Sequence, residues 1–401
     1  MNRPFEGISV VDLTRVLAGP YSTYQLALLG ADVLRVEQPG TSDFVRFGGG
    51  DPDLAAKGLG PGFLAQNANK RSIAVNLKDT RGRDIVRRLS ADADVLTENF
   101  RPGVMERLGL SAESLIAENP RLIYCAISGY GQDGPMAQRP AYDHVVQAVS
   151  GMMVINSDNR GEPWRIGFPM IDYVAGQSAA FAISSALFQR ERTGSGQVID
   201  VAMLDTAVAI MAPALAAYLQ GVTPPRRTGG LAASGSPFSG MFETTEGILA
   251  LAANALPQAQ SVAREIGRVD LLEDIRIKEW GQNDDYVTLV QEALSAAFAT
   301  ATALEWEERL SALDVPAGKV RGPAEIMDSE QLTAREMIHT IADRQTGRDY
   351  RLPGVGFKFS HDGSAVTDPP PRLGQDTDAV LSDLGYDPAQ ISALRAGSVV
   401  A

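Results

Sequence analysis

The residue with the clearest potential for chemistry is Asp172, a carboxylate in the mostly apolar surroundings of residues 161–176, GEPWRIGFPMIDYVAG. Small and apolar residues continue from it to Phe188 and predict a mostly buried helix with Asp172 at or just before its N-terminus. Helix capping is the commoner reason for an aspartate at that place. The positive end of the helix dipole would also keep a nucleophilic carboxylate ionised, so a catalytic role stays open.

Few other side chains suggest chemistry. The single cysteine, Cys125, lies in the strand-like run 122–127, which predicts a buried, inert thiol and excludes a disulfide within the chain. The three histidines, His144, His339 and His361, are scattered, and no cysteine pair accompanies them. We therefore expect no metal site.

Composition limits the class of protein. The chain has 401 residues, of which 44% are hydrophobic and 21% charged, enough for one large domain and a smaller one. Its net charge of −13 disfavours nucleic-acid binding. Apolar runs such as 207–219 are shorter than a membrane span, and MNRPFEGISV lacks the features of a signal peptide. We expect a cytoplasmic protein without nucleic-acid or membrane partners.

The first half of the chain alternates strand-like and helix-like segments, which predicts an α/β fold with a parallel sheet. The expected strands are 8–13, 33–37, 72–77, 94–98, 122–127 and 197–201. The first strand leads into a loop at 15–20 that contains neither G-x-G-x-x-G nor a P-loop. A dinucleotide bound in the usual way is therefore not expected.

Three loops and helix starts near these strands are of interest. Residues 40–65, rich in Gly, Pro and Asp, predict a long irregular segment that covers a site or is disordered. Pro102 suits the first turn of a helix to about 108, whose amides could meet a phosphate. The glycine-rich stretch 128–135 follows a strand, where it would line a ligand crevice.

Residues 224–240, rich in Pro, Gly and Ser, predict a linker and a change of architecture. A hairpin is expected at 241–251, helices from 258 to 313 with a capping box at Thr302 and Glu305, a strand pair near 351–359 and a last helix after Pro388. This divides the chain into a large domain at 1–224 that carries Asp172, a small domain at 225–320 and a C-terminal segment at 321–401.

Several short motifs occur together and in order. They are Val16-Leu17-Ala18-Gly19-Pro20, Gly30-Ala31-Asp32-Val33, Val36-Glu37, Asn69-Lys70-Arg71-Ser72, Glu98-Asn99-Phe100-Arg101-Pro102-Gly103, Gly129-Tyr130-Gly131-Gln132, Gly194-Ser195-Gly196-Gln197 and Leu373-Gly374-Gln375-Asp376-Thr377. Through them the sequence resembles the family III CoA-transferases, which include formyl-CoA transferase and carnitine CoA-transferase and are related to α-methylacyl-CoA racemase.

The resemblance implies that Asp172 is the catalytic nucleophile, which forms an aspartyl anhydride with the donor acyl group and then an aspartyl-CoA thioester. It implies an acyl-CoA donor, a carboxylic acid acceptor and no permanently bound cofactor or metal. Coenzyme A would be held by Leu17, Ala18, Gln38, Val75, Asn76, Leu77, Lys78, Asn99, Phe100, Arg101, Arg107 and Tyr130. The substrate side would include Gln132, Tyr142 and Asp143.

The same resemblance implies a Rossmann-like large domain built from both ends of the chain, a smaller α+β domain, and a homodimer of interlocked subunits. Lys78 and Arg107 suit phosphates, although basic residues at strand and helix ends are commonly solvated. Leu17, Gln38 and Ser128 depart from the glutamine, arginine and lysine of formyl-CoA transferase. The glycine-rich lid of the family is only loosely matched by 229–230 and 234–236.

Two other functions stay open. An α-methylacyl-CoA racemase-like epimerase needs bases on both faces of an α-carbon, but Tyr142 stands where that enzyme has a histidine, and residues 254–258 lack its glutamate. His144, one residue away from the match, is expected to be structural. A non-catalytic CoA-binding scaffold would not require Asp172.

Three arginines suggest which class of acid serves as the acceptor. Arg46, Arg139 and Arg165 could each pair with the distal carboxylate of a dicarboxylic acid such as succinate, or each could be a surface arginine. A substrate panel distinguishes the two interpretations.

Overall fold

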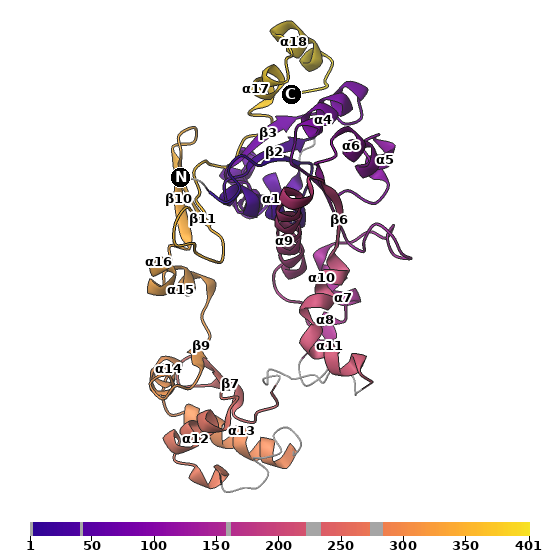
Figure 1. The fold of residues 1–401 in the computed structure, drawn as a ribbon. Helices are drawn as coiled ribbons and strands as arrows, with labels where there is room; N and C mark the ends of the chain where they lie inside the picture. The colour runs from indigo at the N-terminus through magenta and orange to yellow at the C-terminus, as the bar shows by residue number, and fades with distance from the viewer. Residues whose placement is uncertain (1–2, 41–42, 158–161, 222–233, 273–283) are drawn as a thin grey trace. The chain divides into compact units, whose positions relative to one another are not determined.

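The computed structural model describes residues 3–40, 43–157, 162–221, 234–272 and 284–401 (Figure 1). The chain divides into two compact units. The first unit comprises Met1–Ser150, Ile166–Ala214 and Thr333–Ala401, and the second comprises Gly151–Arg165 and Leu215–Leu332. Each is described by itself below.

A six-stranded parallel sheet forms the centre of the first unit, which confirms the predicted α/β class. Its strands are β1 (Ser9–Asp12), β2 (Asp32–Glu37), β3 (Lys70–Ala74), β4 (Val95–Glu98), β5 (Ile123–Ser128) and β6 (Gln197–Ala202). Their order is β3-β2-β1-β4-β5-β6. Val10 pairs with Val33 on one side and Val95 on the other. The sheet therefore reverses its winding direction between β1 and β4, where doubly wound sheets bind ligands.

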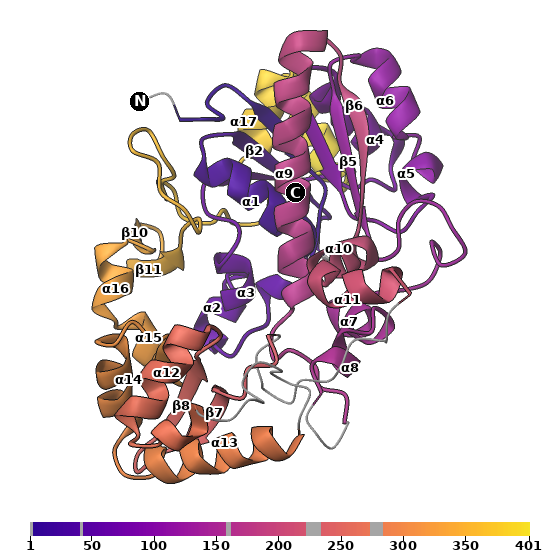
Figure 2. The ribbon, with the colours of Figure 1, turned by 60° about the horizontal axis from the view of Figure 1, so that its bottom comes forward.

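Two helices lie together against one face of this sheet (Figure 2): α1 (Ala18–Leu28) and α9 (Met170–Thr193). Gly176 lets them approach closely, because a Cβ at this position would lie only 2.5 Å from the carbonyl oxygen of Ala18. Both helices are rich in small residues, which suits close helix contact. The first turn of α9 is thereby placed next to the loop that precedes α1.

Other helices contribute to the main hydrophobic core of the first unit together with the strands. They are α4 (Thr80–Ala91), α5 (Val104–Arg107), α6 (Ala112–Glu118), α17 (Thr377–Asp383) and α18 (Pro388–Ala396). The charged helix α4 buries only one apolar stripe, which includes Ile85 and Val86. The helix predicted from Pro102 to 108 is shorter than expected, since the chain becomes helical only after Gly103 adopts a left-handed φ of 81°.

Residues Thr333–Ala401 of the C-terminal segment belong to the first unit, whereas 321–332 belong to the second. Val75 forms a bridge with Val400, and the amide of Asn76 donates to the carbonyl oxygen of Val399. The hairpin of β10 (Ile338–Asp343) and β11 (Arg348–Pro353) shares a small core with α1 through Tyr350. The predicted strand pair near 351–359 was therefore placed too late in the chain, because the turn lies at 344–347, before Pro353 ends the second strand.

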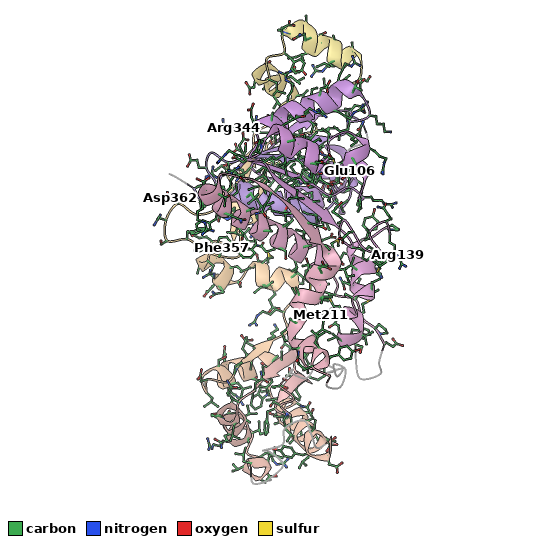
Figure 3. The ribbon with its side chains drawn as sticks, turned by 45° about the vertical axis from the view of Figure 1, so that its right-hand side comes forward. Glu106, Arg139, Met211, Arg344, Phe357 and Asp362 are labelled. Atoms are coloured by element: carbon green, nitrogen blue, oxygen red, sulfur yellow. The ribbon has the colours of Figure 1, made fainter. Side chains whose placement is uncertain are left out.

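Shorter helices connect these elements. In the first unit they are η1 (Phe44–Arg46), α2 (Pro52–Ala56), α3 (Pro61–Leu64), α7 (Asp143–Val149) and α10 (Met203–Ile210); α8 (Met152–Ile155) and most of α11 (Ala212–Leu219) belong to the second unit. Residues 43–65, predicted to be irregular, thus contain three short helices. The apolar run that begins at 203 forms two helices separated at Met211 (Figure 3), because Pro213 has no amide hydrogen to continue one helix.

The second unit contains an antiparallel sheet of three strands: β7 (Ser239–Glu243), β8 (Ile248–Ala252) and β9 (Ala317–Lys319). The predicted hairpin is confirmed, while β9 was not predicted. Its helices are α12 (Leu256–Glu265), η2 (Val269–Leu272), α13 (Asp284–Phe298), α14 (Ala303–Ser311), α15 (Pro323–Met327) and α16 (Glu330–Ala334), which runs on into the first unit. The capping box of α14 is confirmed by bonds between Thr302 and Glu305.

Within the described residues, no single helix is both long and apolar enough to span a membrane, although the bent pair Asp285–Phe298 and Ala303–Ser311 passes that test jointly. The predicted linker lies mostly at 222–233, outside the described residues, as do the glycines of the lid match at 229–230.

Candidate active site

The loops that follow the strands of the parallel sheet converge at its C-terminal edge. The loop after β1 is joined to the loop after β4 by two hydrogen bonds: the Arg15 amide donates to Oδ1 of Asn99, and Nδ2 of Asn99 donates to the Arg15 carbonyl. The Arg15 guanidinium also lies 5.5 Å from the ring centroid of Phe100. These contacts join the two loops where the winding of the sheet reverses.

The loop between β1 and α1 has an uncommon backbone conformation. Val16 has a φ of 68°, in the left-handed region that branched residues rarely adopt. Its amide donates to Oδ2 of Asp43 at 2.7 Å, and its carbonyl accepts from Nε2 of Gln66 at 2.5 Å. Asp43 is held in turn by Arg35 at 2.8 Å. Buried side chains therefore fix the conformation in which Leu17 and Ala18 are presented.

A second buried side chain, that of Lys70, holds the same loop by hydrogen bonds. Lys70 donates to Oδ2 of Asp12 at 3.2 Å and to the Pro20 carbonyl at 2.8 Å. Burial alone would raise the pKa of Asp12, but Lys70, Arg35 and two threonine hydroxyls outweigh it and lower that pKa. Lys70 thus contributes to the fold as a buried ion pair rather than as a ligand for substrate.

Asp172 is the third residue of α9 and does not cap it. Pro169 occupies the N-cap position, and no side chain of that residue accepts a helical amide. Asp172 is 9% exposed and lies on the same face of α9 as Gly176, one turn later, which contacts Ala18. Tyr173 packs edge-on against Tyr21 of α1 with ring centroids 4.8 Å apart. The carboxylate is therefore near the Leu17–Ala18 loop.

The amides at the start of α9 are occupied by another carboxylate. Oδ2 of Asp143 accepts from the amide of Ile171 at 2.6 Å and from that of Asp172 at 3.3 Å. Asp143 is the first residue of α7 and is 5% exposed. The N-terminal amides of α9 thus stabilise the charge of Asp143 rather than that of Asp172.

The electrostatic environment of Asp172 differs from the sequence-based expectation. Burial, and then the negative charge of Asp143, raise the pKa of Asp172 from 3.8 to about 7. The helix dipole was expected to favour the ionised carboxylate, whereas burial and the negative charge of Asp143 favour its protonated form. Raised pKa values of this kind are typical of buried carboxylates in catalytic sites.

The glycine-rich turn after β5 packs beside this pair of carboxylates. A Cβ on Gly129 would lie 2.2 Å from that of Ala141, two residues before Asp143. The amide of Gly131 donates to the Ser128 hydroxyl, and that of Gln132 donates to Oδ2 of Asp200. The turn is therefore fixed at the C-terminal ends of β5 and β6.

Comparison with known proteins identifies the family. The family model for CoA-transferase family III matches residues 5–377. The chain belongs to CoA-transferase family III. It is 35% identical over 399 residues to the succinyl-CoA:glutarate CoA-transferase of Mus musculus, covering 99% of this chain and 90% of that protein. It is 37% identical over 336 residues to the acetyl-CoA:oxalate CoA-transferase of Acetobacter aceti, covering 84% and 85%.

The fold agrees with this assignment. The crystal structure of a CAIB/BAIF family protein from Brucella suis superposes with a TM-score of 0.82 at 32% identity, covering 96% of this chain and 100% of that one. This protein is thus an enzyme, a family III CoA-transferase that takes a CoA thioester as a substrate, as the resemblance implied.

Most residues predicted to bind CoA in this CoA-transferase lie in loops along one edge of the sheet. Leu17 and Ala18 lie in the loop after β1, and Asn99 and Phe100 lie in the loop after β4; the contacts of Arg15 join these two loops. Nε2 of Gln38 donates to Oδ1 of Asn76 at 3.3 Å. The remaining members differ in exposure: Val75 is buried, Leu77 and Tyr130 are half-buried, and Lys78, Arg101 and Arg107 are exposed. In the described part of the chain, no hydrogen bond or ion pair joins those three cations to Asp172.

The residues predicted on the substrate side divide into two groups. Tyr142 is 64% exposed and Gln132 half-buried, whereas Asp143 is buried with both carboxylate oxygens bonded. Sequence reasoning missed Asp43, Gln66 and Gln147. Only Gln147 carried a signal, since it follows Asp143 by one helical turn, a spacing that suits a Gln–Asp hydrogen bond.

The arginines proposed for a distal carboxylate also differ. Arg46 is 1% exposed; its Nε binds Oε1 of Glu37 at 2.8 Å, and the guanidinium lies over the ring of Phe63. It is a structural residue and is removed from the candidates. Arg139 is exposed on the loop before α7 (Figure 3), and Arg165 is exposed shortly before α9.

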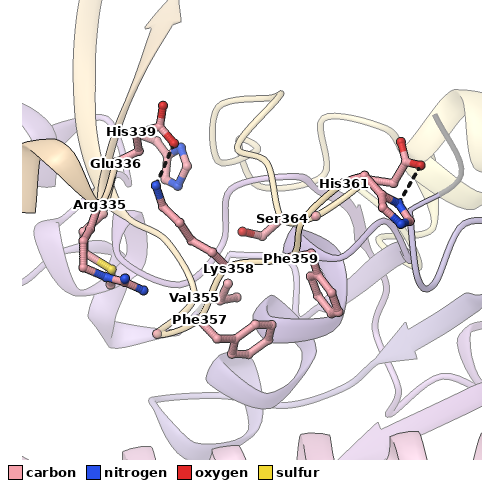
Figure 4. Close-up of a pocket in the computed structure, with 13 residues that line it drawn as sticks. Arg335, Glu336, His339, Val355, Phe357, Lys358, Phe359, His361 and Ser364 are labelled. Atoms are coloured by element: carbon pink, nitrogen blue, oxygen red, sulfur yellow. Dashed lines mark hydrogen bonds and ion pairs between the residues drawn. The ribbon is translucent and has the colours of Figure 1, made fainter.

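A pocket of about 280 Å³ lies in the C-terminal segment, lined by residues between Arg335 and Ser364 (Figure 4). Two of its lining side chains have local partners, Lys358 with Glu336 at 2.9 Å and His361 with Asp362 at 3.4 Å. None of the predicted site residues lines this pocket, and we assign it no part in the reaction.

Proposed function

We propose that this enzyme transfers CoA from an acyl-CoA donor to a carboxylic acid acceptor through covalent intermediates on Asp172. The observation that carries the proposal is the position of Asp172: a buried carboxylate beside the Leu17–Ala18 loop, at the edge where loops after four parallel strands converge. A carboxylate with few water contacts and a raised pKa is a stronger nucleophile once it is ionised.

In the first half of the reaction, a carboxylate oxygen of Asp172 attacks the thioester carbonyl carbon. The carbon–sulfur bond breaks, CoA leaves as a thiolate, and the donor acyl group stays on Asp172 as a mixed anhydride. The thiolate then attacks the Asp172 carbonyl carbon, which releases the donor acid and forms an aspartyl-CoA thioester. These steps exchange one anionic leaving group for another, so no redox group is needed.

In the second half, the acceptor carboxylate attacks the aspartyl thioester and again releases CoA thiolate, which leaves a new mixed anhydride. Attack of the thiolate on the acceptor carbonyl yields the new acyl-CoA and regenerates the Asp172 carboxylate. The amides of Ile171 and Asp172 are already bound to Asp143, so other donors must stabilise the tetrahedral intermediates.

We further propose that CoA lies along the sheet edge, with Lys78, Arg101 and Arg107 near its phosphates and with the loops at 17–18 and 99–100 near the pantetheine arm. Three exposed cations follow β3 and β4, Lys78 and Arg101 in loops and Arg107 at the end of α5, and they offer charge-assisted hydrogen bonds to phosphate oxygens. No permanent cofactor is part of the proposal.

For the acceptor we propose a small dicarboxylic acid. Relatives covering most of this chain are named for glutarate and oxalate, both dicarboxylates. With Arg46 committed to Glu37, the candidate in the first unit for binding the distal carboxylate is Arg139. A matching monocarboxylate would lack the group that such an arginine binds and would react more slowly.

The test is mass spectrometry of CoA species after incubation in heavy water with several acyl-CoAs and a panel of mono- and dicarboxylic acids, for the native enzyme and Asp172→Ala. We expect new acyl-CoA products from dicarboxylates, without deuterium at the α-carbon, and none with Asp172→Ala. Products from monocarboxylates alone would contradict the acceptor class. Deuterium at the α-carbon without a new CoA species would instead establish racemase-like chemistry.

A further inference from the structure

We propose that Asp143 is a positioning residue for Asp172: its carboxylate fixes the first turn of α9, and Gln147 fixes that carboxylate. This inference rests on the proposed function of Asp172 as nucleophile and deepens it. It replaces the role on the substrate side that the sequence suggested for Asp143.

The first observation is the way α9 begins. A helix leaves its first amides without intrahelical partners, and Pro169 at the N-cap has no side chain that could accept from them. Asp143, 29 positions before Asp172, accepts from the amide of Asp172 itself and from that of Ile171. The backbone of the nucleophile is therefore hydrogen-bonded directly to Asp143.

The second observation is that Asp143 is held in turn. Nε2 of Gln147 donates to Oδ1 of Asp143 at 2.6 Å, and Oε1 of Gln147 accepts from the amide of Ile166 at 2.9 Å. Gln147 is completely buried. A continuous set of hydrogen bonds thus runs from the segment that enters α9, through α7, to the amide of Asp172.

The third observation argues against direct contact with substrate. Asp143 is 5% exposed; its Oδ2 already accepts two hydrogen bonds from this chain and its Oδ1 accepts one. Little of its acceptor capacity is left for a substrate group. Its role in the reaction is therefore exerted through Asp172.

Asp143 also affects Asp172 through its charge. Titratable groups on the elements packed against α9 include Tyr21 on α1, His144 on α7 and Asp205 on α10, and Tyr173 neighbours Asp172 on α9 itself. After burial, Asp143 is the charged group that raises the pKa of Asp172. The effect of the hydrogen bonds of Asp143 can be separated from the effect of its charge by a variant that moves the charge to position 147 and keeps the hydrogen bonds.

The double variant Asp143→Asn/Gln147→Glu makes that separation. At position 143, the amide oxygen of the new side chain can accept from the α9 amides, while its NH₂ can donate to the new carboxylate at position 147. The other oxygen of that carboxylate can accept from the Ile166 amide. In the single variant Asp143→Asn, two NH₂ groups face one another and the set is broken.

Two further variants complete the set. Asp143→Ala removes the acceptor for the α9 amides entirely. Asp92→Asn, which replaces an exposed aspartate at the C-terminal end of α4, makes the same change of charge away from the site and is the matched control.

We expect Asp143→Ala to lower kcat by about 100-fold with little change in KM for the acyl-CoA, because the nucleophile is misplaced while the CoA-binding loops are intact. The kcat of Asp143→Asn should lie between that of Asp143→Ala and that of the native enzyme. The double variant should regain most of kcat, with the acid limb of its rate–pH profile moved to lower pH because the negative charge lies farther from Asp172. Asp92→Asn should match the native enzyme.

The outcomes separate this inference from the proposed function. Native enzyme without Asp172-dependent CoA transfer would contradict the proposed function itself. Native transfer with unchanged kcat in Asp143→Ala, or a double variant that folds but stays as slow as Asp143→Ala, would overturn the positioning role. If Asp143→Ala does not fold, the double variant decides, since thermal unfolding shows whether its hydrogen bonds are restored.

Discussion

At the scale of single residues, the protein holds two carboxylates close together and treats them differently. Asp143 accepts hydrogen bonds from the helix amides, while Asp172 is buried beside it without such donors. Neighbouring carboxylates in different environments commonly divide their roles in this way. Burying the ionised carboxylate of Asp172 therefore costs the folded protein free energy, and the proposed nucleophilic attack would make use of this destabilised anion.

This cost predicts how stability changes with pH. The folded-state pKa of Asp172 is raised from 3.8 to about 7, so the folded protein binds a proton more tightly than the unfolded chain does. Stability is lost as pH rises between these values, by roughly 4 kcal/mol at most. Asp172→Asn, neutral at every pH, should be more stable than the native protein at pH 8, with the difference disappearing near pH 4.

Urea unfolding at both pH values, with Asp133→Asn as the exposed control, measures this difference. A stabilisation of equal size at pH 8 and pH 4 would show that packing, and not ionisation of Asp172, is responsible.

At the scale of elements, several motifs that carried the family resemblance prove to be structural. Lys70 pairs with Asp12 beneath the β1–α1 loop. In the motif at 373–377, Oδ2 of Asp376 accepts from the amide of Ser72, and the Thr377 hydroxyl accepts from that of Ala74. Both amides belong to β3, the outermost strand on that side of the sheet. The motif thus protects an otherwise open strand edge.

Replacing Asp376 should therefore affect stability rather than catalysis. Asp376→Ala leaves the partly buried Ser72 amide without its side-chain acceptor, which should cost about 1–3 kcal/mol. Asp378→Ala is the matched control, since its pair with Arg395 is exposed and worth about 0–1 kcal/mol. Denaturant unfolding measures both, and unchanged KM for the acyl-CoA is expected. Equal losses from the two variants would contradict the edge-protecting role.

The sequence predicted the features that depend on residues close together in the chain. Alternating segments predicted all six strands of the parallel sheet, and Thr302 and Glu305 predicted the start of α14. The contacts around Asp172 could not be predicted, because Asp143 and the α9 amides are 28 and 29 positions apart and meet only in the folded protein. Likewise, nothing in the sequence distinguished Arg46, a buried partner of Glu37, from an arginine available to substrate.

At the scale of the whole molecule, the first unit leaves an apolar surface exposed. Phe181 and Phe188 on α9 are 73% and 66% exposed, and Val198 on β6, the outermost strand on the other side of the sheet, is 52% exposed. The helix that carries the buried Asp172 at one end thus presents aromatic rings to solvent farther along. Surfaces of this kind usually mark an interface, which supports the homodimer that we propose on the basis of the family resemblance.

The double variant Phe181→Ala/Phe188→Ala tests whether a second copy of the chain covers this surface. Burying each phenylalanine contributes about 1.5–3 kcal/mol, so removing both rings should raise the dimer dissociation constant by at least about 100-fold. Light scattering over a dilution series measures the change. Leu304→Ala, an exposed residue of α14, is the control and should leave the dissociation constant unchanged. A native protein that is monomeric at every concentration would contradict the homodimer, and a native dimer that the double variant does not weaken would place the interface elsewhere.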